Sequence, residues 1–199
     1  MKYRHTSIQL DTVRFIFLDR DGVLNRKLPE GRYATRRSDL QVSSGAAAAL
    51  AKLNRNGRTV LLVTNQRGIG LGFMTEDQLT QLHDELRQDL AERGARLDAI
   101  YYCPHDPSRE QCLCRKPKTG LFEQAMRDFP EICGDNSLVI GDSLSDIQAG
   151  RQLGMRTVFI EGDALYRKPG SEEAASLADA VAESLETAVA GLLQDSGGS

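Results

Sequence analysis

The stretch FIFLDRDG, residues 15–22, joins a run of apolar residues to two aspartates and a glycine. The apolar run Phe15–Leu18 is typical of a parallel strand that is covered on both faces. Asp19 and Asp21 follow at once, although like charges placed so close together repel each other. Two such carboxylates need a cation or a reacting group between them. The stretch therefore predicts a buried strand that ends in a functional site.

Length and composition favour one soluble domain. The chain has 199 residues, 40% of them hydrophobic and 27% charged, which is ordinary for a globular protein. The net charge of −3 gives no basic field that would attract nucleic acid or an acidic membrane. The N-terminal segment has no apolar signal region, and no apolar run approaches the roughly 20 residues of a membrane helix. We expect a cytoplasmic monomer that acts on a small molecule, with a core over about 13–165 and a C-terminal helix over about 171–194.

Short apolar runs alternate with helical patterns along the chain. Helices are predicted over about 44–56, from Thr75 to Gly94, and over about 120–129 and 144–153, and Thr75 with Gln78 forms a possible capping box. The predicted strands are FIFLD (15–19), TVLLVTN (59–65), AIYYC (99–103), SLVIGD (137–142) and TVFIEG (157–162). This alternation predicts an α/β fold, a doubly wound, mainly parallel Rossmann-like sheet with helices on both faces. The segments 25–43 and 104–117 do not fit the alternation and are predicted to be functional loops.

Acidic residues follow two of the predicted strands. Asp19 and Asp21 follow the first, and Asp142 ends the fourth. The carboxyl ends of parallel strands meet at one edge of a doubly wound sheet, where ligands bind. Three carboxylates without an equal cluster of bases indicate a hard divalent cation, most simply Mg²⁺. Capping of the following segments is the alternative for Asp19 and Asp142, but it does not explain the Asp19 and Asp21 pair.

Four motifs in order resemble those of the haloacid dehalogenase superfamily of phosphatases. They are DRDG (19–22), VTNQ (63–66), RKP (115–117) and GDSLSD (141–146). The resemblance covers about residues 15–162 and implies phosphoryl transfer through an aspartyl-phosphate. It implies that Asp19 is the nucleophile and Asp21 the general acid and base, and that Thr64 and Lys116 hold the phosphoryl group.

The same resemblance implies the metal and substrate contacts. Mg²⁺ would be held by Asp19, Asp142 and the backbone carbonyl of Asp21. Gly22 would let the backbone turn where a phosphate approaches. Asp146 lies one turn after Asp142 and either supports the metal or sits at a helix N-terminus that Ser143 caps. The substrate-binding candidates are Gly22, Asn65, Gln66, Arg67 and Arg115.

A second cluster combines thiols with an imidazole. Cys103, His105, Cys112 and Cys114 lie within twelve positions and match the ligands of a closed, structural tetrahedral zinc site. A disulfide is the alternative, but nothing in the sequence marks a secreted protein. The zinc would close a loop that points Arg115 and Lys116 at the phosphate. Cys133 is interpreted as a core residue.

The zinc pattern C-P-H…C-x-C-R-K-P narrows the resemblance to a subgroup with a small cap or none. The chain looks most similar to the heptose 1,7-bisphosphate 7-phosphatases, and the related histidinol-phosphate phosphatases share the zinc pattern. The short loop between His105 and Cys112 is similar to the histidinol-phosphate group, so both substrates stay open. A receiver-like phospho-acceptor domain and a zinc-binding interaction module are the non-enzyme alternatives. His5 and His83 are interpreted as surface residues.

Basic residues concentrate in the predicted loops of a chain that is acidic overall. Such enrichment suits a substrate with a second phosphate, because arginine pairs well with phosphate oxygens. We expect about half of these side chains to be ordinary solvated residues. The set is Arg26, Lys27, Arg32, Arg36, Arg37, Arg67, Arg115 and Lys118.

Overall fold

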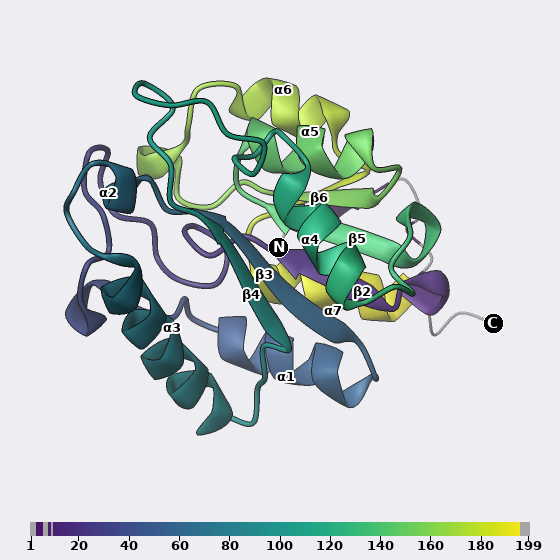
Figure 1. Cartoon of the computed structure of the whole chain (residues 1–199). Helices are drawn as coiled ribbons and strands as arrows, with labels where there is room; N and C mark the ends of the chain where they lie inside the picture. Colours follow the sequence, from purple (N-terminus) through teal and green to yellow (C-terminus); the bar gives the residue numbers. More distant parts are fainter. Residues whose placement is uncertain (1–2, 6–7, 9, 196–199) are drawn as a thin grey trace.

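A computed structural model describes residues 3–5, 8 and 10–195, and its strands form one sheet (Figure 1). The strand order is β1-β7-β6-β5-β2-β3-β4; every neighbouring pair is parallel except β1 and β7. The strands are β1 (Tyr3–His5), β2 (Phe15–Leu18), β3 (Thr59–Asn65), β4 (Ala99–Cys103), β5 (Ser137–Gly141), β6 (Arg156–Ile160) and β7 (Ala180–Ala182). The predicted doubly wound, mainly parallel sheet is confirmed.

Helices cover both faces of this sheet, as Figure 1 shows. The helices are α1 (Ala46–Arg55), α2 (Arg67–Gly70), α3 (Glu76–Ala91), α4 (Gly120–Asp128), α5 (Leu144–Gln152), α6 (Ser171–Leu177) and α7 (Leu185–Asp195). Short 3₁₀ turns are η1 (Leu10–Thr12), η2 (Arg37–Asp39), η3 (Gly134–Asn136) and η4 (Ala164–Tyr166). The predicted capping box begins α3, because Thr75 Oγ1 accepts from the Gln78 backbone N–H and Gln78 Oε1 accepts from the Thr75 N–H.

Alternating residues of β2 pack into two different cores. Ile16 and Leu18 lie in the core shared with α1 and α7, whereas Phe15 and Phe17 lie in the core shared with α4. The Phe17 ring lies 5.1 Å from the ring of Phe122. A strand with apolar side chains on both faces has no face left for water, which explains the continuous apolar run in the sequence. Burial of β2 on both sides fixes the position of the residues that follow it.

The C-terminal segment corrects the sequence prediction of one long helix. It forms α6, then the strand β7, and then α7. β7 pairs in parallel with β6, and the register places Ala180 opposite Val158. Asp179 strengthens the junction, because its Oδ2 accepts from the backbone N–H of Thr157 at 2.8 Å. The alanine-rich sequence favours a helix, but the backbone groups of β6 need partners and override that local preference.

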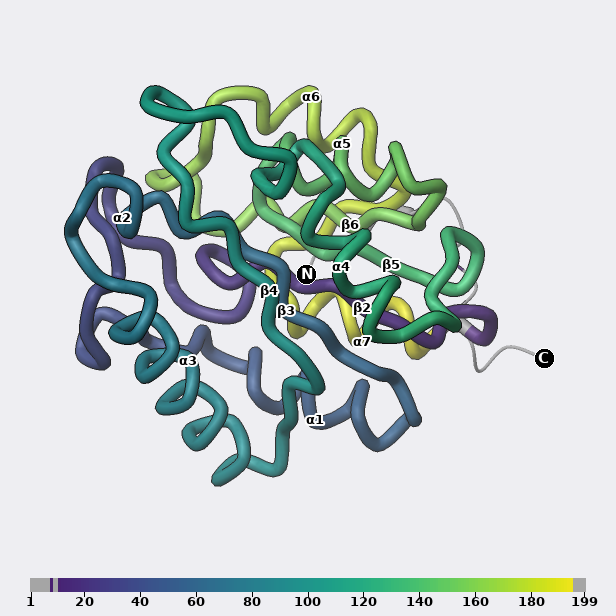
Figure 2. Tube along the Cα trace, in the orientation of Figure 1, coloured from purple at the N-terminus to yellow at the C-terminus, as the bar shows by residue number. Residues whose placement is uncertain are grey.

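Loops that are distant in sequence meet at the carboxyl edge of the sheet. Segments 25–43, 104–117 and 162–170 lie beyond this edge, as the trace in Figure 2 shows. Side chains from all three segments line one cavity of about 580 Å³, a volume in the range of small-molecule sites. Among the described residues, no helix is both long enough and apolar enough to cross a membrane.

Candidate active site

Three aspartates lie together at the carboxyl ends of β2 and β5. The carboxylates of Asp19, Asp142 and Asp146 each place an oxygen within 4.8 Å of the others, and all three residues are buried. The parallel pairing of β2 with β5, which sets Leu18 opposite Ile140, carries Asp19 and Asp142 to the same edge. Oxygen ligands from carboxylates are the donors that hard divalent cations prefer, so this cluster could hold such an ion.

Gly22 is required by its conformation and by its neighbour. Its φ is +98°, and a Cβ atom there would lie 2.3 Å from Asp142 Oδ2. A side chain at this position would therefore be strained and would also displace the Asp142 carboxylate. The turn of the DRDG motif is thus shaped around the acidic cluster.

Lys116 joins the acidic cluster from the loop between β4 and α4. Its Nζ lies 2.9 Å from Asp19 Oδ1 and 2.6 Å from Asp146 Oδ1, and it also donates to the Val63 carbonyl. Burial lowers the pKa of Lys116, but Asp146 and Asp19 outweigh it and raise this pKa overall. Burial raises the pKa of Asp19 to about 6, and Lys116 opposes the rise. At neutral pH Asp19 is therefore mainly ionised beside a fixed ammonium group.

The carboxylate of Asp21 is held by three side chains. Arg20 donates to both of its oxygens, through Nε at 3.2 Å and Nη2 at 2.9 Å. Asn25 Nδ2 donates to Oδ1 at 3.0 Å, and Gln66 Nε2 donates to Oδ2 at 3.1 Å. Burial raises the pKa of Asp21, but the Arg20 charge and these hydrogen bonds outweigh it and lower this pKa. The side chain keeps 32% of its exposure, so it is held in place and still reaches the cavity.

Asp146 combines a capping role with a place in the cluster. Its Oδ2 accepts from the Ser143 backbone N–H at 3.0 Å and from the Ser143 hydroxyl, which makes a capping box at the start of α5. Its other oxygen is paired with Lys116. Burial raises the pKa of Asp146, but Lys116 outweighs it and keeps this pKa lowered. The interpretation of Asp146 as a residue at a capped helix N-terminus thus corresponds to contacts in the structure, and its support of a metal stays a prediction.

The side chains of the VTNQ motif make two kinds of hydrogen bond, one between motif residues at the cavity and one to the backbone of Lys116. Thr64 is buried at the cavity, and its hydroxyl accepts from Gln66 Nε2 at 2.8 Å. Asn65 instead bonds the backbone of Lys116 twice, through Nδ2 at 3.2 Å and Oδ1 at 3.1 Å. Asn65 therefore ties the segment that carries Lys116 to the end of β3.

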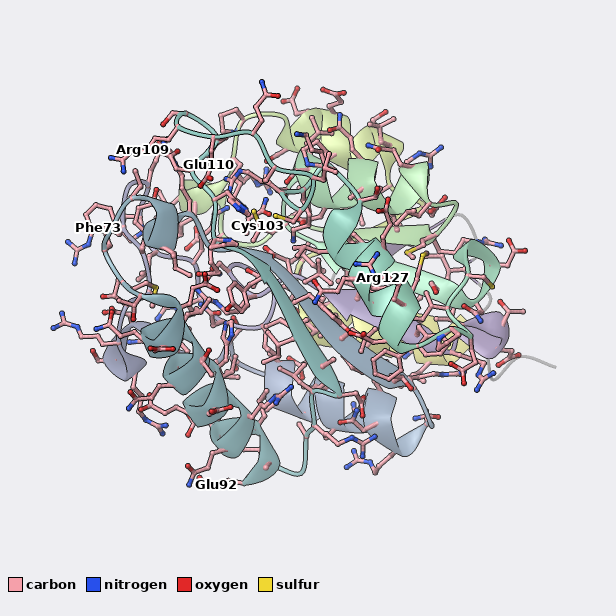
Figure 3. The ribbon with its side chains drawn as sticks, in the orientation of Figure 1. Phe73, Glu92, Cys103, Arg109, Glu110 and Arg127 are labelled. Atoms are coloured by element: carbon pink, nitrogen blue, oxygen red, sulfur yellow. The ribbon has the colours of Figure 1, made fainter. Side chains whose placement is uncertain are left out.

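The four thiol and imidazole groups also come together. The sulfur–sulfur distances are 3.7 Å from Cys103 to Cys112 and 3.2 Å from Cys103 to Cys114. His105 Nδ1 lies 3.4 Å from the sulfur of Cys103 and 3.1 Å from that of Cys114. A tetrahedral ion with bonds of about 2.3 Å to sulfur and 2.0 Å to nitrogen separates its ligands by about 3.5–3.8 Å. Figure 3 shows the sulfurs gathered beside Cys103, and the loop tip with Arg109 and Glu110 lies outside the cluster.

Two isolated residues differ from the sequence interpretation. Cys133 is exposed and is therefore not a core residue. His83 is 4% exposed, and its Nε2 lies 3.2 Å from Arg20 Nη1. The periodicity of α3 counts apolar residues only, and it gave no signal that a histidine shares the buried face. The side chain of His5 lies outside the described residues.

Half of the basic set predicted from the sequence lines the cavity, as expected. Lys118 donates to the Cys112 carbonyl, and Arg26 lines a smaller hollow of about 190 Å³. Arg36 and Arg37 pair with Asp39 and Asp89 on exposed surface. The residues that line the main cavity are Lys27, Arg32, Arg67 and Arg115.

The arginines of the cavity differ in how they are held. Arg67 Nε pairs with the buried carboxylate of Asp106 at 2.7 Å. Arg115 Nη1 is buried and has no hydrogen-bond partner within the described part of the chain. A buried guanidinium nitrogen without an acceptor is costly unless a ligand supplies one. Arg115 is therefore the arginine of this cavity that most needs an anionic ligand.

Two basic residues of the cavity were missed from the sequence. Arg167 and Lys168 belong to the loop after β6 and also line it. Lys168 Nζ lies 3.0 Å from Asp142 Oδ1, while Lys27 Nζ lies 2.7 Å from Oδ2 of the same carboxylate. The run Arg167–Gly170 follows a predicted strand at its carboxyl end, which was the available signal.

Comparisons with known proteins agree with this arrangement. A model of the HAD-hydrolase-like family matches residues 113–188. A D-glycero-beta-D-manno-heptose-1,7-bisphosphate 7-phosphatase from Haemophilus ducreyi is 41% identical over 148 residues, which cover 71% of this chain and 79% of that protein. The protein of the same name from Haemophilus influenzae is 38% identical, with 85% and 91% covered.

Solved structures lead to the same group. The crystal structure of D,D-heptose 1,7-bisphosphate phosphatase from B. bronchiseptica, complexed with magnesium and phosphate, has a TM-score of 0.78 and 30% identity. The similarity covers 92% of this chain and 99% of that one. The chain therefore belongs to the HAD-like hydrolases and, among them, to the family of D-glycero-D-manno-heptose-1,7-bisphosphate 7-phosphatases.

Proposed function

We propose that this chain is a Mg²⁺-dependent phosphatase that removes the 7-phosphate of D-glycero-D-manno-heptose 1,7-bisphosphate through an aspartyl-phosphate on Asp19. The observation that carries the proposal is the pairing of Asp19 with Lys116 at the carboxyl edge of the sheet, next to Asp21 on the cavity side. A buried carboxylate whose ammonium partner can also neutralise a phosphoryl group is suited to attack phosphorus.

In the first step a carboxylate oxygen of Asp19 bonds to phosphorus, and the bond from phosphorus to the sugar oxygen breaks. Asp21 gives its proton to that oxygen, so the sugar leaves as a neutral alcohol. In the second step Asp21 takes a proton from water, whose oxygen attacks phosphorus and releases Asp19 and inorganic phosphate. Asp21 needs its proton at the start, and the negative phosphoryl group raises the pKa that Arg20 lowers in the free enzyme.

The acidic cluster offers oxygen donors that suit Mg²⁺, although the sequence did not show that Lys27, Lys116 and Lys168 pair with the same carboxylates. Its donors are carboxylate oxygens of Asp19 and Asp142, with the backbone carbonyl of Asp21 proposed as a third ligand. The ion would neutralise charge that develops on the transferred phosphoryl oxygens. Thr64 and Lys116 would hold those oxygens, and Gln66 keeps both Thr64 and Asp21 in place.

The cluster of Cys103, His105, Cys112 and Cys114 is proposed as a structural zinc site. Four soft or imidazole ligands with no place for water are typical of such sites. Lys116 follows Cys114 by two residues, so an ordered loop fixes the lysine that meets Asp19. The cluster requires reduced thiols, which favours the cytoplasm. We also propose that the single sheet with its helices forms one domain that works as a monomer.

The second phosphate of the substrate would bind in the basic part of the cavity. Arg115 has a buried nitrogen without a partner, and Arg67 is fixed by Asp106 close to the same space. Arginine pairs with phosphate through two parallel hydrogen bonds. The cationic amine of histidinol phosphate would instead be repelled by Arg67, Arg115 and Lys168.

The test is phosphate release from three substrates at controlled Mg²⁺. We expect many turnovers and a kcat/KM for heptose 1,7-bisphosphate well above that for a heptose monophosphate or histidinol phosphate. Asp19→Asn serves as the inactive control. Single-turnover labelling without steady release would contradict the phosphatase, and preference for histidinol phosphate would contradict the substrate.

A further inference from the structure

Arg20 is a fully buried cation, and each of its three guanidinium nitrogens contacts either Asp21 or His83. It is 1% exposed, although it lies between the two aspartates of the motif. Its Nε and Nη2 donate to the two oxygens of Asp21, and Nη1 lies 3.2 Å from Nε2 of His83. A buried guanidinium must have acceptors for its N–H groups. Asp21 supplies two of them, and His83 supplies the acceptor on the far side.

The chemistry of arginine and histidine determines which of the two side chains donates the hydrogen bond. Arginine has no acceptor, so His83 Nε2 is the unprotonated nitrogen and the ring proton is on Nδ1. Burial, followed by the charge of Arg20, lowers the pKa of His83 to about 3. A neutral ring is therefore the form that meets Arg20, and α3 holds it in place. The ring also packs 6.0 Å from the ring of Tyr102.

We propose that His83 is a positioning residue that orients the acid–base carboxylate of Asp21 through Arg20. The inference rests on the proposed function, because it assigns His83 to the proton transfers of that reaction. Asp21 must reach the leaving oxygen first and a water molecule afterwards, so its orientation matters in both steps. Without an acceptor at Nη1 the guanidinium can rotate, and its two hydrogen bonds to Asp21 then pull the carboxylate out of the orientation that Asn25 and Gln66 also hold.

The test compares two substitutions that differ in one acceptor. His83→Leu removes the acceptor and keeps a similar volume, whereas His83→Gln places an amide oxygen near the position of Nε2. A misplaced catalytic group costs rate, so we expect kcat of His83→Leu on the bisphosphate to fall about tenfold with KM within about twofold. His83→Gln should stay within about twofold of the wild type. Equal kcat values in all three proteins would overturn the proposal.

Leaving-group dependence separates positioning from simple loss of packing. 4-Nitrophenyl phosphate has a leaving group that needs little protonation, whereas glycerol 2-phosphate needs a general acid. His83→Leu should form the aspartyl-phosphate at the wild-type rate from the first substrate and about tenfold more slowly from the second. The matched control is Leu82→Ala, which truncates a buried residue of the same helix that belongs to the apolar cluster with Met74 and Leu79. The same selective loss in Leu82→Ala would contradict the role of His83.

Two further measurements keep the outcomes distinct. If His83→Leu does not fold, His83→Asn replaces it, because its amide is too short to reach Arg20 while His83→Gln is not. Slow turnover in His83→Asn with rescue in His83→Gln supports the proposal, and equal turnover in both overturns it. An inactive wild type would refute the proposed function itself. If Asp21→Asn loses turnover while the His83 variants keep the turnover of the wild type, only this inference is refuted.

Discussion

The thiol cluster and the acidic cluster are both sets of potential metal ligands, but they are assembled in different ways. Cys103, His105, Cys112 and Cys114 come from one loop of twelve positions. Asp19 and Asp142 follow two strands that are far apart in the chain, and Asp146 lies in the first turn of α5. The first set depends on local chain reversal, whereas the second requires β2 and β5 to be paired. The comparison teaches that soft ligands can be recognised from spacing alone, while the meaning of a carboxylate depends on its neighbours.

The largest expected effect is at the acidic cluster. Asp19→Asn removes the nucleophile, and kcat should fall by at least about a thousandfold. Because burial raises the pKa of Asp19, its ionised form lowers the free energy of unfolding at neutral pH. The neutral amide of asparagine removes this destabilisation. The melting temperature without divalent ions should therefore not decrease. Asp77→Asn, on the exposed side of α3, is the control, and activity above about 1% of the wild type would contradict the role of Asp19.

Disruption of the thiol cluster should act through the loop instead. Protein purified without chelator should hold about one zinc per chain, and Cys112→Ser should lose it and melt at a lower temperature. The displaced Arg115 and Lys116 should raise KM about tenfold. Cys133→Ser is the matched control, because Cys133 is exposed and lies outside the cluster. Full activity and unchanged melting in zinc-free protein would separate this cluster from the site.

Arg115 connects the two clusters, since it follows Cys114 and reaches the cavity beside the aspartates. Arg115→Ala should lower the preference for the bisphosphate over the monophosphate by roughly tenfold or more, as expected for a charge-assisted hydrogen bond. Hydrolysis of 4-nitrophenyl phosphate should change little. Arg36→Ala, an exposed arginine paired with Asp39, is the control. An unchanged preference would move the second phosphate to another part of the cavity.

The last expected effect concerns the pH dependence of stability, not catalysis. The pKa of His83 is about 3 in the folded chain and near 6.5 when unfolded, so the unfolded state binds more protons between these values. Stability from this group is present above pH 6.5 and is lost as pH falls, by about 2 kcal/mol at pH 5. His83→Gln keeps the acceptor without titrating, so its unfolding free energy should fall less between pH 7 and pH 5. Parallel denaturation curves at both pH values for the two proteins would contradict this assignment.

Features of this protein that depend on local pattern could be predicted from the amino-acid sequence. Continuous apolar runs marked β2 to β6 because strands buried on both faces exclude polar residues. The motif DRDG and the spacing of the thiol ligands defined both clusters, because the chemistry of these residue types is fixed by the residues themselves. The rule that parallel strands end at one edge was enough to bring Asp19 and Asp142 together.

The side chains that support those clusters from distant parts of the chain became visible only in the folded protein. β7 forms where a helix was predicted, because the edge of β6 supplies hydrogen-bond partners that a sequence pattern does not show. Lys168 reaches Asp142 from a loop, and His83 reaches Arg20 from the buried face of α3. The local sequence pattern around a lysine or histidine does not show whether its side chain is exposed or buried. Its charge state and its partners are set by the elements that pack around it, and these are fixed only when the chain folds.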